Sequence, residues 1–140
     1  MIIEKVEKNG LVEAIYRSSN IIASTYNQID GTLKIIFKHG GSYSYSNVEN
    51  TDYVRFETAE SQGKILNSNI KNYAFIKNEN VDTKEVINRI KKLKQEEIES
   101  FKKMIFKLLN ENALSYKNSG NFYDLNKLNK IINTYNKLIE

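Results

Sequence analysis

The sequence contains no cysteine and no proline, and it has a single histidine, His39. Without cysteine there are no disulfides and no thiolate metal sites, which fits a reducing compartment, so we expect a cytoplasmic protein. One histidine in a glycine turn cannot build a catalytic triad or a metal cluster, and no carboxylate pair has an evident acid–base partner. No apolar run approaches the roughly 18 residues of a membrane span. We therefore expect a non-enzymatic protein without cofactor, metal or membrane partner.

A mild excess of positive charge is present. The chain carries 21 basic and 17 acidic residues, for a formal net charge of +4, which suits anionic partners such as nucleotides or nucleic acid. Among the basic residues, arginine occurs only as Arg17, Arg55 and Arg89. Because a guanidinium group makes bidentate contacts to phosphate, these three arginines are candidate phosphate ligands.

The first 78 residues alternate apolar and polar side chains between turn signals, a pattern typical of an antiparallel sheet. The turn signals are Asn9-Gly10, Asp30-Gly31 and Gly40-Gly41. Tyr43 and Tyr45 are two residues apart, so both rings project from one face of their strand. That face either packs in the core beneath a helix or forms a surface for a flat ligand.

A short helix is expected to cover the sheet. Thr51 and Asp52 are suitable capping residues for it, and the segment 61–63 is expected to end it. Residues 73–76 then predict a closing strand, so the sheet domain is expected to span residues 1–78.

The apolar period changes after residue 78. Asp82 and Glu85 predict a capped helix start, and apolar residues at alternating three and four spacing continue to about Tyr116. After a loop at 118–120, a second apolar series runs from Phe122 to Ile139. The sequence therefore predicts an α+β fold, with an N-terminal antiparallel β-sheet and a short helix followed by a long C-terminal αα-hairpin over residues 79–140.

The apolar stripe of this hairpin is longer than a small sheet can cover. A helix of some 33 residues spans roughly 50 Å. A second copy of the hairpin would bury the uncovered part, so we expect a homodimer or a higher homo-oligomer. A hairpin folded only on its own chain is the alternative.

Aromatic residues are the other feature that indicates a ligand. Nine tyrosines and six phenylalanines accompany the positive charge, and bases stack on aromatic faces. Tyr73 and Phe75, in the closing strand, are candidate stacking residues. Lys64 follows Ser61-Gln62-Gly63 near a helix boundary, where free backbone N–H groups could hold an anion, and it is a candidate helper.

Residues 19–76 resemble the KTSC domain, a module found at the C-terminus of some lysyl-tRNA synthetases and alone in bacterial and phage proteins. The matching elements are Ser19-Asn20-Ile21, residues 33–37, Gly40-Gly41, Tyr43-Ser44-Tyr45, Val48, Tyr53, Ala59, Ser61, Gly63, Asn67, Ile70 and Tyr73. Glu49 stands where the family usually has proline, and Ile65-Leu66 where it has an aromatic pair. The resemblance implies an RNA-binding role.

The order of a β-sheet core and two long C-terminal helices also resembles the phage anti-Thoeris sponge proteins. Such proteins sequester cyclic ADP-ribose isomers without cleaving them. This second resemblance implies that the chain traps a cyclic nucleotide immune signal, with Arg17, Arg55, Lys64, Tyr73, Phe75 and Arg89 as ligand contacts. The alternatives are an RNA- or DNA-binding KTSC module and a phage protein that inhibits a host protein through its helical hairpin.

Overall fold

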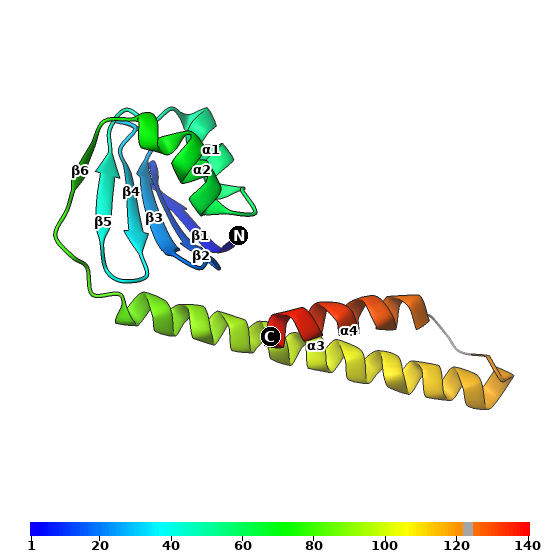
Figure 1. The fold of residues 1–140 in the computed structure, drawn as a ribbon. Coiled ribbons are helices and arrows are strands. Elements are labelled where there is room, and N and C mark those ends of the chain that lie inside the picture. The colour runs from blue at the N-terminus through cyan, green and yellow to red at the C-terminus, as the bar shows by residue number, and fades with distance from the viewer. Residues whose placement is uncertain (122–124) are drawn as a thin grey trace. The chain divides into compact units, whose positions relative to one another are not determined.

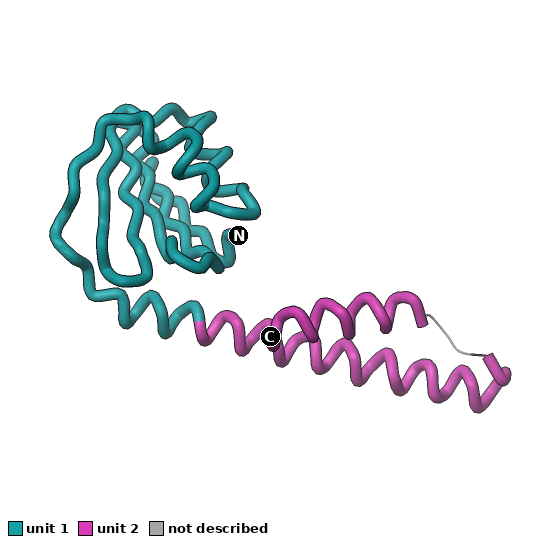
Figure 2. Tube along the Cα trace, in the orientation of Figure 1, with its two compact units in different colours: residues 1–90 teal, residues 91–140 magenta. Residues whose placement is uncertain are grey.

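The computed structural model describes residues 1–121 and 125–140. The chain divides into two compact units, residues 1–90 and 91–140 (Figure 2). The sequence predicts that the sheet domain ends at residue 78, whereas the first compact unit extends to Ile90. Phe122, assigned above to the second apolar series, lies outside the described residues.

Six antiparallel strands form one sheet with the order β1-β2-β3-β4-β5-β6 (Figure 1). Their bounds are β1 Ile2–Lys8, β2 Leu11–Tyr16, β3 Ile21–Asn27, β4 Leu33–Phe37, β5 Ser42–Tyr45 and β6 Phe75–Lys77. The expected turns are confirmed. Asn9 and Gly10 both have positive φ (53° and 76°), as the tight turn between two strands requires.

One face of the sheet carries the core of the first unit. Val12, Ala14 and Tyr16 alternate inward along β2 and are at most 2% exposed. They pack with inward residues of the neighbouring strands and with Tyr53, Phe56, Leu66 and Ile70 from the helices that cover this face. The antiparallel sheet and its covering helices confirm the α+β class.

Two short helices, rather than one, cover this face. Helix α1 spans Asn50–Glu57, helix α2 spans Gln62–Ser68, and a 3-10 turn, η1, spans Ile70–Asn72. Helix α1 ends at Glu57, before the segment 61–63 that was expected to end it, and a second helix that the sequence did not predict begins at Gln62. Gln62 is fully buried, and its amide nitrogen donates to the carbonyl of Ala59 at 2.8 Å. This contact satisfies a backbone group between the helices, so the chain can start a second helix where the sequence suggested a stop.

The cap of α1 also differs from the expectation. The N-cap residue is Glu49, without a side-chain cap bond, and Thr51 lies inside the first turn. Asp52 does not cap the helix as expected. Its carboxylate instead accepts hydrogen bonds from Asn69 and Tyr73.

The long helix α3 spans Lys84–Ser119 and α4 spans Leu125–Ile139. The start of α3 is as expected, because the Asp82 carboxylate accepts from the backbone N–H of Lys84 at 3.0 Å. It ends at Ser119, past the expected end near Tyr116 and inside the segment 118–120 that was expected to be a loop. Within the first unit, Arg89 on α3 is ion-paired with Glu4 on β1.

In the second unit α4 folds back along α3 (Figure 1). Leu108, Asn112, Leu128 and Leu138 are the residues of this unit that are buried among those described. Large apolar side chains that stay at least 40% exposed include Met104, Phe106, Leu109, Leu114, Tyr116, Leu125 and Ile139. Of the helices in the described residues, none is long and apolar enough to cross a membrane.

Candidate functional site

A cavity of about 360 Å³ opens between helix α2 and the side of the sheet formed by β4, β5 and β6. Most of its apolar wall comes from four rings, those of Phe37, Tyr43, Tyr45 and Phe75, together with Ile21 and Leu66. The register explains why these rings gather. Tyr45 lies opposite Phe75 across the β5–β6 ladder, and Tyr43 is two residues from Tyr45 on the same face.

The rings contact one another edge to face or tilted. The Tyr43 ring centroid is 5.9 Å from that of Phe75 and 5.8 Å from that of Phe37, and Tyr45 and Phe75 are 5.6 Å apart. Tyr45 is 5% exposed, and burial raises the pKa of its hydroxyl. Phe75, by contrast, is 53% exposed. Tyr45 therefore belongs to the core and the cavity wall at once, while Phe75 offers a ring face to an incoming ligand.

Three polar side chains complete the cavity wall, those of Asn20, Asn67 and Lys71. Asn20 precedes β3, Asn67 lies on α2, and Lys71 lies on η1. The amides supply donors and acceptors, and the ammonium group supplies a positive charge. Lys71 is exposed and forms no ion pair with any residue that the structure describes. It is therefore available to an anionic group of a ligand.

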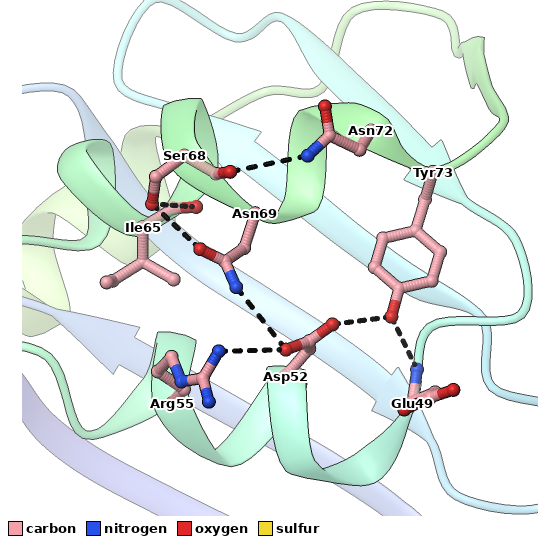
Figure 3. Close-up of polar contacts among 8 residues, drawn as sticks. All are labelled: Glu49, Asp52, Arg55, Ile65, Ser68, Asn69, Asn72 and Tyr73. Atoms are coloured by element: carbon pink, nitrogen blue, oxygen red, sulfur yellow. Dashed lines mark hydrogen bonds and ion pairs between the residues drawn. The ribbon is translucent and has the colours of Figure 1, made fainter.

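A polar network ties both ends of η1 to helix α1 (Figure 3). The Asp52 carboxylate accepts hydrogen bonds from the Tyr73 hydroxyl at 2.6 Å, the Asn69 amide at 3.4 Å and Arg55 at 3.3 Å. The Tyr73 hydroxyl also accepts from the backbone N–H of Glu49 at 3.3 Å. The bond to Asp52 raises the pKa of Tyr73, so this hydroxyl stays protonated and keeps donating at neutral pH.

This network holds two residues of the cavity wall in place. Tyr73 lies between Lys71 and Phe75 in the chain, and both of these line the cavity. The next residue, Ala74, accepts through its carbonyl from the backbone N–H of Ser46 at 2.8 Å. The segment that carries the lysine and the ring is thus fixed to α1 on one side and to the end of β5 on the other.

Of the residues that sequence reasoning singled out, Phe75 lines the cavity. Tyr73 and Arg55 are brought together, but around Asp52 rather than in the cavity wall. Lys64 is exposed on α2, next to Gly63, which does line the cavity. Tyr73 is thus better described as a residue that supports the cavity than as a stacking ring.

The other two arginines lie near β1 and β2, at the edge of the sheet away from β5 and β6. Arg17 directly follows β2, and its backbone N–H donates to the carbonyl of Met1 at 2.7 Å. Arg89 makes a two-point contact with Glu4 on the edge strand β1, and this contact lowers the pKa of Glu4. Neither arginine lines the cavity beside β5 and β6.

Sequence reasoning did not assign Phe37, Asn20, Asn67 or Lys71 to a ligand site. The asparagines and the phenylalanine belong to the elements quoted for the KTSC resemblance, so a signal was present without a role attached to it. Lys71 had no signal, because it is one of many lysines and only the 3-10 turn places it at the cavity. Among the described residues, no group of three or more His, Cys, Asp or Glu side chains is arranged to hold a metal.

Comparison with known protein families agrees with the KTSC resemblance. The KTSC domain family matches residues 17–75, close to the limits of 19–76 inferred above. A crystal structure of a KTSC domain protein from Yersinia pestis is similar to the chain, with 26% identity, 49% of this chain and 99% of that chain covered, and a TM-score of 0.47. No curated protein matches the sequence. The matched segment ends at Phe75 and includes all ten cavity-lining residues.

Proposed function

We propose that this KTSC-domain chain is a non-enzymatic protein that binds and sequesters a small nucleotide, with a cyclic ADP-ribose isomer as the expected ligand. The aromatic cavity beside α2 carries the proposal. A volume of about 360 Å³ falls within the range of small-molecule sites, which are mostly apolar with a few polar groups that orient the ligand. A base would enter against the exposed face of Phe75, and the amides of Asn20 and Asn67 would meet its polar edge.

Lys71 would hold a phosphate of the ligand, because it is the cationic side chain of the cavity wall. A diphosphate would need further cations, and Arg17, Arg55 and Arg89 lie outside this wall. The proposal therefore includes a homo-oligomer in which a neighbouring copy supplies arginine contacts. The apolar residues left exposed on α3 and α4 support self-association of the helical unit.

Replacement of Phe75 by alanine tests the cavity directly. Base stacking on an aromatic ring contributes about 1–3 kcal/mol, so Phe75→Ala should weaken nucleotide binding by roughly 5- to 150-fold in isothermal titration calorimetry. Ile76→Ala is the matched control. It lies on the same short strand, is 66% exposed and projects to the other face of the sheet. Equal affinity of both variants and the wild type for cyclic ADP-ribose isomers would contradict the proposal.

Sequestration also predicts that the ligand survives binding. The protein is incubated with nucleotide-signal extract, separated from unbound material and heat-denatured, and the released compound is identified by mass spectrometry. An intact nucleotide supports sequestration. A cleaved or rearranged product would show that the protein is an enzyme.

The second candidate is binding of single-stranded RNA or DNA by the KTSC domain. The half-exposed ring of Phe75 beside a single lysine favours this reading, since one base and one phosphate of a strand would fill such a site. The two candidates differ in their salt dependence. A strand that contacts several cations loses affinity steeply with salt, whereas a nucleotide that contacts one or two cations gives a shallow dependence.

A further inference from the structure

The net positive charge of the chain resides in its helical unit. Residues 1–90 contain eleven basic and eleven acidic residues, whereas residues 91–140 contain ten lysines and six acidic residues. A general preference for lysine in the coding sequence would raise the lysine content of both units alike. The separation of neutral and basic units therefore favours an anionic partner for the helical unit.

Helix α4 is the part of this unit that has lysines but no acidic residue. Between Leu125 and Ile139 it contains Lys127, Lys130 and Lys137, all exposed. With 3.6 residues per turn, Lys130 and Lys137 lie within about 20° of each other around the helix axis, and Lys127 lies about 60° from Lys130. The three lysines therefore share one side of the helix. Asn126, Asn133 and Thr134 lie beside or between them, and amide and hydroxyl groups also hydrogen-bond to phosphate.

The side of α4 away from Lys137 is apolar and partly occupied within the unit. Leu128, about 180° around the helix from Lys137, is 6% exposed, and Leu138, about 100° from Lys137, is 8% exposed. A membrane-surface helix would have to insert this apolar side into lipid, and these two leucines already pack inside the unit. The lysine side of α4 is a polar, charged surface in water, and this favours a polyanion over a lipid surface for that side.

The lysines of α4 differ from those of α3 in their pairing. On α3, Lys92, Lys102 and Lys107 lie 3.1–4.0 Å from Glu96, Glu99 and Glu111, respectively. Lys127, Lys130 and Lys137 form no ion pair with any residue of the described part of the chain. Within the described residues no carboxylate pairs with them, so their charges can contact the anionic groups of a partner.

We propose that the lysine side of α4 binds the sugar–phosphate backbone of nucleic acid, without reading base sequence, at a place separate from the aromatic cavity. The span from Lys127 to Lys137 is about 15 Å along the helix, over which a duplex carries about nine phosphates. Binding is non-specific, so dissociation constants of about 10⁻⁴–10⁻⁶ M are expected at physiological salt. The proposal does not depend on the nucleotide ligand proposed for the cavity.

The test measures fluorescence anisotropy of a short labelled duplex and of labelled oligothymidylate, with the full chain, between about 50 and 200 mM salt. One variant combines Lys127→Gln, Lys130→Gln and Lys137→Gln. The control combines Lys8→Gln, Lys38→Gln and Lys77→Gln, three exposed lysines of the first unit. Both variants change the net charge equally, and circular dichroism verifies that the helices are retained.

The α4 variant is expected to reduce the slope of log K against log salt by about 2–3 on the duplex, since each lost phosphate contact removes about 0.9. The control variant is expected to keep most of the slope. Equal losses in both variants would show that only net charge matters, and loss in the control alone would place the contact on the KTSC domain. Either result overturns the proposal, as does wild-type protein that binds phosphatidylserine vesicles but neither oligonucleotide. All three results leave the Phe75 experiment unaffected.

Discussion

Replacement of Tyr73 by phenylalanine tests whether the polar network of Asp52 supports both the fold and the cavity. The substitution keeps the ring and removes the hydroxyl, which donates to a carboxylate at 2.6 Å and accepts from a backbone N–H at 3.3 Å. Hydrogen bonds to charged groups contribute about 1.5–3 kcal/mol each. Because Tyr73 is only half-buried, water replaces part of this, and we expect a loss of about 1–2 kcal/mol.

The assay is urea unfolding monitored by circular dichroism. A loss of about 1–2 kcal/mol, with m near 2 kcal/mol/M, lowers the midpoint by about 0.5–1 M. Arg55→Gln is the matched control, because it removes another partner of Asp52 whose side chain is 58% exposed, and exposed pairs contribute little. A Tyr73→Phe protein as stable as the wild type would refute the structural role of the network.

A fluorescence reporter separates positioning of the cavity from stability. The chain contains no tryptophan, so Phe75→Trp introduces a single tryptophan, whose fluorescence reports on the cavity wall. If the Tyr73 hydroxyl positions this segment, adding Tyr73→Phe shifts the tryptophan emission and weakens the quenching of that emission by bound nucleotide. Both changes should appear at urea concentrations well below the unfolding midpoint, where the protein is still folded. Identical spectra and quenching in the two backgrounds would show that the network does not position the ring.

Two further predictions concern the ion pair on the sheet edge and the helical unit. The pKa of Glu4 is lowered by Arg89, so the pair stabilises the fold above the ordinary glutamate pKa and the contribution is lost as pH falls through the lowered value. Glu4→Gln should therefore unfold earlier than wild type in thermal melts at pH 7, and the difference should shrink below the ordinary glutamate pKa and disappear below the lowered pKa of the folded state; a pH-independent difference would contradict this. The wild-type protein should sediment as a dimer or larger species, and Leu109→Lys, at a position 48% exposed, should shift it toward monomer. A wild-type chain that sediments as a single subunit at working concentration would exclude the proposed oligomer.

Local patterns in the sequence predicted the elements whose signals lie within a few residues. Asn9-Gly10 predicted a strand turn because only residues that tolerate positive φ fit there, and both residues have it. Asp82 predicted the start of the long helix because its carboxylate can satisfy a free backbone N–H in the first turn. The alternation of Val12, Ala14 and Tyr16 predicted which face of β2 is buried.

Helix α2 was missed because its cause is not local. Gln62 follows a serine and precedes a glycine, a combination that usually ends a helix. Its side chain is buried against the carbonyls that end α1, and only the packing of both helices on the sheet makes that contact available. With α2 missing from the expectation, the cavity beneath it could not be inferred.

The sequence by itself determined the strand alternation, the tight turns, the helix periods and the overall charge, since these depend on neighbouring residues and on composition. It also indicated that Tyr43 and Tyr45 share a face. Only the tertiary structure decided that this face is both core and cavity, that Lys71 rather than an arginine lies beside the rings, and that Tyr73 bonds to Asp52. These outcomes depend on contacts between residues far apart in the chain, for which short-range spacing carries no information.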